Sequence, residues 1–516
     1  MAMLEIGSTK QLFIDDYIIE SLTNAKQGLN PAVKVDHNPI LRQERPWEGT
    51  VLDVGKVLFD AQDQLFKMWY NTATPKFRTG VLGEPFMGKS KPVRGGPAGP
   101  VLDFEGGVTC FATSADGVHW ERPALGLVEF EGSRENNILP TGADRPNAPA
   151  FLDTQEQDPG KRFKGFTMIG DTQTMGMQYN LFFSPDGIDW TPYENNPVID
   201  TPGLGRWAGK FLGWDPIRET YAVTMEASYH RRGPYGKRLI GRAESPDLVH
   251  WSEPEIILVP DEDDFPDTEF YSMPVIFYEG VYIGLVWVFR TTNTTHHPEL
   301  VFSRDGYHYQ RNYREPFIPR GGARAEFDSN NVYVQDIIVH GERIFIYYFG
   351  SNYRSPETFL ALGDKAARYT GLATIPLDGF VSVDGGKGWV VTNTPEDELQ
   401  HISMWDYQLQ VSQGPASFSQ MVTRSFSFSG SRLYLNLSCT PLVASPGLPE
   451  VRVEILKPNF KNLPEYTFED ADPITESSLA QAVSWKGNSD VSSLSGQSIK
   501  LRFYFKNAKL YSFQFR

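Results

Sequence analysis

Carboxylate, arginine, asparagine and aromatic side chains recur directly before five apolar, strand-like segments of this sequence. Carboxylates accept hydrogen bonds from hydroxyl groups, and aromatic rings pack against the apolar face of a sugar. These residue types therefore suit a carbohydrate site, provided that the fold brings the five positions together. The residues concerned are Trp47, Glu48 and Asp53; Asp144, Arg145 and Asn147; Arg206 and Trp207; Asp267, Glu269 and Tyr271; and Glu326, Asp328 and Asn330.

Paired carboxylates have a definite chemistry. In glycoside hydrolysis one carboxylic acid protonates the leaving oxygen, and a second carboxylate acts as nucleophile or base. Several acids in one cavity raise the pKa of some of them, so that one stays protonated near neutral pH. The segment "DTEFY", residues 267–271, fits best. Period-two alternation places Asp267, Glu269 and Tyr271 on one face of a strand and Phe270 on the other. We expect Glu269 to be the general acid.

Five segments share one pattern, in which a strand, a short polar hairpin and an aromatic-rich strand follow one another. Apolar and β-branched residues dominate them, and their hairpins are rich in Gly, Asp, Pro and Gln. A pattern repeated along a chain indicates a repeat architecture, and five units of short strands predict a five-bladed β-propeller. The innermost strands of such blades line a central funnel, which would gather the residues named above. The five segments are 54–71, 148–170, 209–226, 273–289 and 332–350.

A short phrase follows four of these segments. Asp-Gly is strong turn chemistry, since Gly accepts positive φ and Asp bonds the nearby backbone. We therefore predict that Asp116, Asp186, Asp247 and Asp305 lie in outer turns, far from the funnel, and have no catalytic part. The four copies are "SADGVHW" (114–120), "SPDGIDW" (184–190), "SPDLVHW" (245–251) and "SRDGYHY" (303–309).

The remaining segments complete the expected architecture, which is all-β. The apolar segment 10–20 is expected to form the outer strand that closes the last blade and hides its edge. The Gly- and Pro-rich insertion 74–107 is expected to be a lid or rim loop. After about residue 400 the five-fold pattern stops and period-two alternation continues, which indicates a β-sandwich. The predicted domains are thus a catalytic propeller over 1–400 and a C-terminal sandwich over 401–516.

Composition narrows the function classes. The 516 residues carry a formal net charge of −16, which argues against nucleic acid or an anionic membrane surface as partner. An oligo- or polysaccharide is the expected partner, and a homo-oligomer remains possible at this stage. Cys110 and Cys439 lie far apart and show no metal-site spacing. No cofactor and no catalytic metal are expected, although a structural calcium in the funnel is an option.

The sequence also bears on localisation. It contains no run of 18 apolar residues and therefore predicts no transmembrane helix. Its first 20 residues lack the features of a secretory signal, so a cytoplasmic location is expected. A secreted or periplasmic protein whose signal had been removed would present the same start.

The blade pattern, the "S-x-D-G-x-x-W" turns, "FKMWY" (66–70) and the C-terminal β-sandwich resemble the five-bladed-propeller glycoside hydrolases of families 32, 43, 68 and 117. "LFIDDYIIE" followed by "NPILRQERPWEG" looks like a group of bacterial proteins labelled family-32-like. The resemblance implies a nucleophile or base Asp at the start of the first inner strand, which Asp53 matches. It implies an acid Glu on a later blade, for which Glu269 is the nearest match, and a further Asp that tunes it.

The family-32 signatures "NDPNG", "RDP" and "EC" are absent, and Asn147 stands where family 43 would show Asp. With Asp53 and Glu269 as the reacting pair, Asp267 and Asp328 are expected to tune the pair or bind substrate. The expected substrate-binding residues are Trp47, Glu48, Asn147, Arg206, Tyr271 and Glu326.

Four functions stay open at the level of sequence. The first is an exo-acting glycoside hydrolase on a terminal fructofuranosyl or arabinofuranosyl unit. The second is a carbohydrate-binding propeller without catalysis. The third is a phosphorolytic enzyme with a cationic phosphate site, to which His230, Arg231, Arg232, His296 or His297 would contribute. The fourth is a sialidase, because the turn phrase is similar to the sialidase Asp box; its arginine triad would be Arg206, Arg290 and Arg354.

Overall fold

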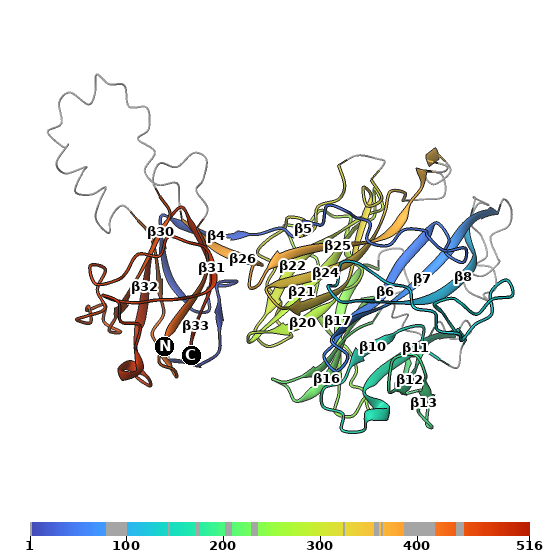
Figure 1. The fold of residues 1–516 in the computed structure, drawn as a ribbon, viewed down its shortest axis with the longest axis horizontal. Helices are drawn as coiled ribbons and strands as arrows, with labels where there is room; N and C mark the ends of the chain where they lie inside the picture. Colours follow the sequence, from blue (N-terminus) through green and yellow to red (C-terminus); the bar gives the residue numbers. More distant parts are fainter. Residues whose placement is uncertain are drawn as a thin grey trace, which may run out of the picture. The chain divides into compact units, whose positions relative to one another are not determined.

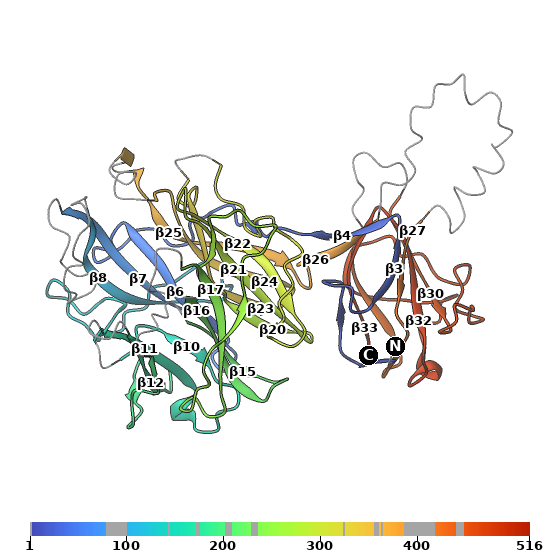
Figure 2. The ribbon, with the colours of Figure 1, turned by 180° about the vertical axis from the view of Figure 1, so that it is seen from behind.

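The computed structural model describes residues 3–78, 101–142, 145–171, 176–201, 209–228, 236–322, 326–354, 361–362, 365–385, 418–439 and 448–516. The chain divides into two compact units. We call residues 31–374 the central unit, and residues 1–30 together with 375–516 the terminal unit. Both consist of β-sheets whose strands are mainly antiparallel (Figures 1 and 2).

The central unit contains five consecutive groups of antiparallel strands. The first is β6 (Val51–Asp60), β7 (Leu65–Arg78), β8 (Val101–Ser114) and β9 (Ile138–Leu139). The second is β10 (Pro149–Leu152), β11 (Phe163–Asp171), β12 (Gly176–Ser184), β13 (Thr191–Pro192) and β14 (Ile199–Thr201), with the short helix η1 (Pro159–Lys161). The third is β15 (Lys210–Asp215), β16 (Thr220–Ser228), β17 (Arg238–Ser245) and β18 (Glu255–Leu258).

The last two groups complete this unit. The fourth is β19 (Thr268–Phe270), β20 (Val275–Tyr278), β21 (Val281–Arg290) and β22 (Thr295–Ser303). The fifth is β23 (Asn331–His340), β24 (Arg343–Ser351) and β25 (Arg368–Pro376), with β5 (Val33–Lys34) on the edge of β25. We interpret each group as one blade.

The five groups close into a ring. Strand β6 contacts β10, β10 contacts β15, β15 contacts β20, and β23 contacts both β21 and β6. Parallel pairs join β22 to β23 and β25 to β6, so the last group is hydrogen-bonded to the first. The propeller-type, all-β fold predicted from the sequence is thus confirmed. The count of five blades remains an interpretation, which rests on these five groups.

The repeated phrase forms the turns that follow β8, β12, β17 and β22. In the second group Ser184 Oγ accepts the Gly187 N–H at 2.8 Å, and Asp186 Oδ1 accepts the N–H groups of Ile188 and Asp189 at 2.8 and 2.9 Å. The turns at Asp116, Asp247 and Asp305 repeat the Asp contacts. The carboxylates serve their own turns, as predicted.

These turns also join neighbouring groups. The indole of Trp69 on β7 donates to Gly187 O at 2.9 Å, and Tyr347 on β24 donates to Gly117 O at 2.7 Å. The second contact connects the fifth group to the first across 230 residues of sequence. Two of the four copies thus anchor their group to the preceding one by a hydrogen bond to the turn.

A second repeated device sits at the end of the first strand of three groups. Asp60 is paired with Arg162 of the second group. Asp153 accepts from Tyr221 Oη of the third group at 2.8 Å, and Asp215 accepts from Tyr282 Oη of the fourth at 2.6 Å. Each aspartate thus binds the following group, so that the first three groups are linked forward as well as backward.

The terminal unit is a β-sandwich. Its larger sheet runs β31–β29–β33–β26–β4 with β2 on β33, and its smaller sheet runs β3–β27–β32–β30; β1 pairs with β28. Buried aromatic and aliphatic side chains, Phe13, Phe503 and Phe513 among them, form one core. The bounds are β1 Leu4–Gly7, β2 Gln11–Leu12, β3 Ile19–Thr23, β4 Ala25–Leu29, β26 Val381–Gly385, β27 Ser419–Thr423, β28 Phe426–Phe428, β29 Leu433–Cys439, β30 Glu450–Leu456, β31 Ser478–Ala482, η5 Ser492–Leu494, β32 Lys500–Lys506 and β33 Ala508–Phe515.

Two sequence-based expectations about organisation need correction. Segment 10–20 does not close the ring: β2 pairs with β33 and β3 with β27, both in the terminal unit. The outer strand of the fifth group is β5 instead. The predicted domains 1–400 and 401–516 become 31–374 for the central unit and 1–30 with 375–516 for the terminal unit. The physical reason is that residues 1–30 and β26 take their hydrogen bonds from sandwich strands.

Part of the predicted insertion 74–107 is regular. Residues 74–78 extend β7 and residues 101–105 extend β8, in antiparallel register. Residues 79–100 lie outside the described part, so the lid function stays a prediction.

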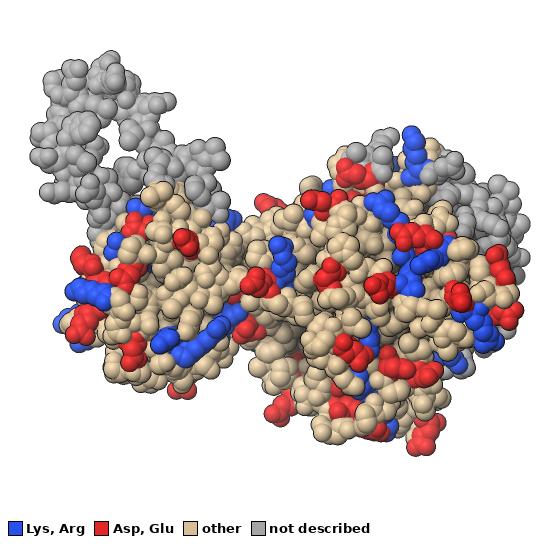
Figure 3. All heavy atoms as spheres, viewed as in Figure 1, with Lys and Arg blue, Asp and Glu red and all other residues tan. Residues whose placement is uncertain are grey.

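The face of the molecule shown in Figure 3 carries acidic and basic side chains interspersed with one another. Nothing on this face concentrates one sign of charge as a nucleic-acid site would. The part of the chain that the structure describes contains no helix with the length and apolar character needed to span a bilayer.

Candidate active site

Asp53 lies near the start of β6 and is held by an arginine from the last strand of the ring. Arg368 on β25 donates from Nε to Asp53 Oδ1 at 2.9 Å, and its Nη2 lies 2.6 Å from Oδ2. The parallel pairing of β25 with β6 brings the two residues together. Burial raises the pKa of Asp53, and Arg368 partly offsets this effect. The result is an oriented carboxylate of increased basicity.

Glu269 on β19 is held by a second arginine. Arg238 Nη1 on β17 donates to Glu269 Oε2 at 2.6 Å, and its Nε lies 3.7 Å from Oε1 of the buried Glu226. The guanidinium also lies over the Tyr271 ring, 5.2 Å from the centroid. Asp267, Glu269 and Tyr271 are half-buried while Thr268 and Phe270 are buried, which confirms the predicted alternation along this segment.

Aromatic rings connect the two arginine–carboxylate pairs. Tyr271 stacks on Trp287 at 6.3 Å, and Trp287 contacts Tyr333 at 5.0 Å. Tyr333 interacts electrostatically with Asp53, Arg368 and Tyr271, and burial raises its pKa. Tyr271 in turn interacts electrostatically with Arg238, Glu226 and Arg368. Phe349 stacks on Tyr333 at 4.7 Å and carries the Arg368 guanidinium over its ring at 4.8 Å. We call the two arginine–carboxylate pairs and the rings between them, which come from four of the five groups, the cluster.

Charged residues bridge the first strands of the ring next to this cluster. Lys56 on β6 is paired with Asp336 on β23 at 2.6 Å, and Lys210 on β15 donates to Gln335. Lys210 also lies 5.3 Å from the centroid of the Trp287 ring. Burial lowers the pKa of Lys210 to about 8. Lys56 and Asp336 each lie three residues further along their strands than Asp53 and Tyr333, so they tie the strands together beyond the cluster.

Two predicted binding residues belong instead to a buried network. Glu48 is 2% exposed and accepts from Tyr70 Oη and Arg122 Nε, both at 2.7 Å. Its other oxygen accepts two backbone N–H groups. Trp47 donates to Asn137 Oδ1 at 2.9 Å. The expectation that Glu48 binds sugar is wrong, because protein donors occupy both of its oxygens and no solvent reaches it. The contact of Trp47 with Asn137 gives Trp47 a role in packing.

The acids of the fifth group are also bound by the protein. Asp328 is 2% exposed, accepts from Tyr348 Oη at 2.8 Å and pairs with Lys34 at 2.6 Å. It fastens the outer strand β5 and has no surface for a substrate, which corrects its predicted part in catalysis. Glu326 is exposed and accepts the Gly322 N–H at 3.1 Å.

The other predicted positions lie apart from the cluster or outside the described residues. Asp267 is paired with Arg290 at 2.6 Å, and this contact lowers the pKa of Asp267 to about 2. Asn147 is exposed and precedes β10. The predicted residues outside the described part are Asp144, Arg206, Trp207, His230, Arg231 and Arg232.

The arginine triad of the sialidase hypothesis stays a prediction, because Arg206 lies outside the described residues. Arg290 pairs with Asp267, and Arg354 donates to the Asn293 carbonyl at 3.3 Å. The arginines that reach the cluster are Arg238 and Arg368, neither of which was predicted from the sequence. Both lie on third strands, β17 and β25, away from the positions before first strands for which the sugar site was predicted. The sequence alone does not show that Arg238 lies beside Glu269 or Arg368 beside Asp53, because these neighbours depend on which strands pair.

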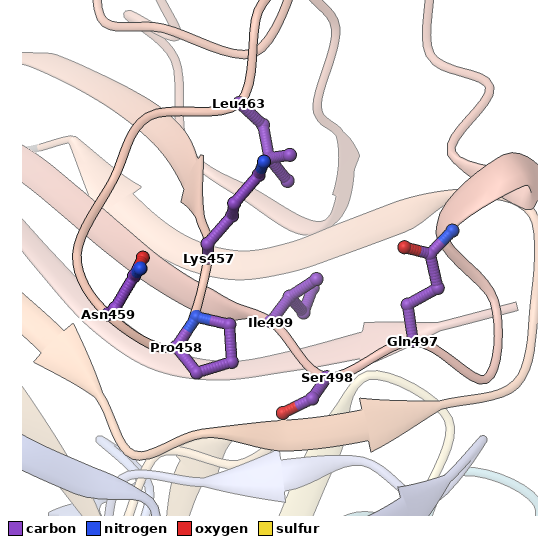
Figure 4. Close-up of a pocket in the computed structure, with 7 residues that line it drawn as sticks. All are labelled: Lys457, Pro458, Asn459, Leu463, Gln497, Ser498 and Ile499. Atoms are coloured by element: carbon purple, nitrogen blue, oxygen red, sulfur yellow. The ribbon is translucent and has the colours of Figure 1, made fainter.

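No candidate metal site marks a second site in the described residues. No group of three or more His, Cys, Asp or Glu side chains there could hold a metal ion. A shallow pocket lies in the terminal unit (Figure 4). Its lining offers no carboxylate and no aromatic ring, so it has no catalytic pair. The lining residues are Lys457, Pro458, Asn459, Leu463, Gln497, Ser498 and Ile499.

Comparison with known proteins gives matches in structure alone. No family model matches the chain, and no curated protein matches it. Among solved structures, the chain is similar to one described as a glycoside hydrolase, with 13% identity and a TM-score of 0.42 over 68% of this protein and 92% of the other.

Two further solved structures illustrate the range. The β-1,2-mannobiose phosphorylase from Listeria innocua has 12% identity and a TM-score of 0.42, over 67% of this protein and 98% of the other. A thermostable family-43 glycoside hydrolase has 14% identity and a TM-score of 0.40, over 66% and 95%. These are likenesses in structure at low identity and low TM-score. At these identities and scores, activity has to be argued from the residues of the site.

Proposed function

We propose that the protein is a glycoside hydrolase that releases a terminal furanoside, fructofuranosyl or arabinofuranosyl, from an oligo- or polysaccharide. The observation that supports this proposal is the gathering of Asp53 and Glu269, from the first strands of two groups, in one cluster with Tyr271, Trp287 and Tyr333. A carboxyl pair beside aromatic rings is the set of side chains that a glycosidase uses.

In the proposed reaction Glu269 gives its proton to the glycosidic oxygen as the bond to the anomeric carbon breaks. Arg238 holds Oε2 of Glu269, and among the described residues no hydrogen bond reaches Oε1. Asp53 attacks the anomeric carbon or takes a proton from the attacking water. Arg368 fixes its orientation, and its raised pKa makes the carboxylate a stronger base. The anomeric form of the first product, followed by NMR, distinguishes attack by Asp53 from attack by water.

Exo-action is supported by the bridges between first strands. The Lys56–Asp336 pair and the Lys210–Gln335 contact join β6, β15 and β23 beyond the cluster. A chain of sugars could not pass through a ring that is tied in this way, so it would enter with one end. The furanoside itself rests on the sequence resemblance, and a screen with nitrophenyl furanosides and pyranosides, fructans and arabinans tests it.

The test of the carboxyl pair compares substrates. Glu269→Gln should lower turnover on an ordinary glycoside by about 10²–10⁴-fold, the usual contribution of a general acid. The loss should be much smaller on a nitrophenyl glycoside, whose leaving group needs no proton. Asp53→Asn should fail on both. Glu255→Gln, an exposed position on β18, is the matched control and should keep full activity.

Two results would contradict the proposal. Near-normal turnover of Glu269→Gln on the natural substrate would remove Glu269 from the role of acid. A wild type that binds sugars but cleaves nothing in the broad screen would instead favour a carbohydrate-binding propeller.

Phosphorolysis is the second candidate, and Lys210 is the observation that favours it. This amine pairs with an amide rather than a carboxylate, so it could face an anion. The same screen with inorganic phosphate decides, because a phosphorylase would release a sugar phosphate, whereas a hydrolase would release the free sugar at an unchanged rate.

A further inference from the structure

A chain of buried polar groups runs behind the candidate site. Asn331 Oδ1 accepts the backbone N–H of His296 at 2.9 Å, and Asn331 Nδ2 donates to Ser351 Oγ at 2.9 Å and to the Tyr353 carbonyl at 3.3 Å. These contacts fix the orientation of the amide, since a carbonyl can only accept. In every hydrogen bond that it makes, Asn331 Oδ1 is therefore the acceptor.

This orientation decides which nitrogen of His296 carries the proton. Nδ1 lies 3.1 Å from Asn331 Oδ1, and two lone pairs would repel each other at that distance. Nδ1 must therefore be protonated. Burial lowers the pKa of His296 to about 3, so the ring is neutral near pH 7 and Nε2 is bare. Nε2 is buried and has no hydrogen-bond partner, as expected for this tautomer.

The protonated Nδ1 also determines what Tyr333 can do. Tyr333 Oη lies 2.9 Å from the same nitrogen and can only accept from it. The phenol proton is therefore not used in this contact, and no other described residue accepts it. Tyr333 is half-buried, and its ring stacks on Phe349 at 4.7 Å. The guanidinium of Arg368, which holds Asp53, lies over the same Phe349 ring at 4.8 Å. The Tyr333 O–H is a donor without an acceptor, beside the proposed nucleophile or base.

We propose that Tyr333 donates a hydrogen bond to a hydroxyl oxygen of the sugar bound against Asp53, and that His296 is a positioning residue that keeps the phenol proton free for it. This inference rests on the proposed function, since it assigns a further residue to the same site. The chemistry it requires of the ligand is an oxygen acceptor, which every sugar hydroxyl supplies.

The first experiment is a set of variants assayed on the nitrophenyl glycoside that the wild type cleaves. Tyr333→Phe removes one neutral hydrogen bond, so kcat/KM should fall by about 2-fold to 12-fold. Tyr347→Phe, which loses a phenol that bonds to Gly117 O at a blade turn, is the matched control and should keep its kcat/KM.

The second set tests His296. His296→Leu should match Tyr333→Phe, and the double variant should be no worse than either, because both changes remove one interaction. His296→Asn places an amide donor near the position of Nδ1 and should restore most of the loss. Thermal unfolding of each variant identifies any that fail to fold. An unchanged kcat/KM in Tyr333→Phe, or additive losses in the double variant, would overturn the inference.

A substrate-independent measurement separates this inference from the proposed function. The ¹⁵N shifts of the His296 ring distinguish a protonated nitrogen from a bare one. At pH 7 we expect a protonated Nδ1 and a bare Nε2, and the opposite tautomer would overturn the inference. If the wild type cleaves no glycoside, the proposed function fails while the tautomer still decides whether His296 leaves the phenol proton free.

Discussion

The four outer turns and the central cluster of the same unit follow opposite rules. At the turns Ser and Asp repeat in every copy, and the contacts made by Asp186 are made again by Asp116, Asp247 and Asp305. In the cluster four groups each contribute something different: Asp53 from the first, Arg238 from the third, Glu269 from the fourth, and Tyr333 and Arg368 from the fifth. Residue types that recur from group to group therefore indicate the ring fold, whereas residues that differ from group to group indicate the candidate site.

The physical basis of this difference is symmetry. Each turn solves the same problem, since its backbone must reverse and pack on the preceding group. A ligand on the axis is not five-fold symmetric, so the residues around it have no reason to be alike. The comparison predicts that turn substitutions change stability and leave the intrinsic turnover of the folded enzyme unchanged, whereas cluster substitutions do the reverse.

The largest stability effect is expected where one turn departs from the repeat. Leu248 takes the position of Gly117, Gly187 and Gly306, with φ of 69° and 3% exposure, and it packs on Phe151 and Leu181. Leu248→Ala should cost about 2–5 kcal/mol of unfolding free energy, as buried Leu→Ala changes do. Leu248→Gly should cost about 1 kcal/mol less, because Gly relieves the left-handed backbone.

Urea unfolding of both variants checks this order. Elsewhere in a β-strand or helix Gly is worse than Ala, so a Gly variant that is the less stable of the two would show that the backbone at this turn is unstrained.

The next effect separates backbone strain from packing. Gly187 has φ of +82°, and an added Cβ would lie 2.5 Å from Trp69 Cζ2. Gly126 has φ of +70°, and nothing lies within 4 Å of its added Cβ. Gly126→Ala should therefore cost about 1–2 kcal/mol from strain alone. Gly187→Ala should cost about 1–3 kcal/mol more from overpacking.

Denaturant midpoints measure the difference, and kcat of the folded fraction measures function. Equal losses in the two variants would mean that Trp69 moves freely away from the turn. A lower kcat in either would mean that the turns reach the site.

The repeats explain why most of the central fold could be predicted. Asp-Gly turns and strand–hairpin–strand segments are local signals, and they give the antiparallel groups and the outer position of Asp186. The prediction for segment 10–20 was wrong because the sequence of an apolar strand does not show which sheet edge the strand joins. Its residues satisfy β33 and β27 of the terminal unit as well as they would have satisfied the last blade.

The site could be predicted only in part, for a related reason. Asp53, Glu269 and Tyr271 were predicted because they stand out around the start of first strands, and their roles stay predictions. Glu48 and Asp328 stand out in the same way but are bound by protein partners, Arg122 and Lys34, that lie 74 and about 300 residues away in sequence. Arg238 and Arg368 were missed because a partner on a third strand is visible only once strand register is known.

A smaller effect tests the link between the last group and the first. Tyr347 is fully buried, and its hydroxyl donates to Gly117 O at 2.7 Å. Tyr347→Phe leaves this carbonyl without its partner, which should cost about 1–3 kcal/mol of unfolding free energy. Thermal unfolding measures the loss. No loss at all would mean that the turn of the first group is held by packing alone.

Asp267 tests where the boundary between the two kinds of residue lies. It adjoins Glu269 in sequence, yet it makes a local ion pair with Arg290, which lowers its pKa to about 2. A depressed pKa contributes stability above the unfolded value of about 3.9, and this contribution is lost as the pH falls through about 2. Asp267→Asn should therefore reduce stability at pH 7 by about 1 kcal/mol, since the pair is partly exposed. The difference in unfolding free energy between wild type and variant should shrink as the pH falls from 4 to 2.

Urea unfolding at several pH values measures this difference, and kcat on the nitrophenyl substrate measures function at pH 7. A kcat that falls 100-fold with unchanged stability would move Asp267 from the fold to the catalytic cluster, as the sequence first suggested.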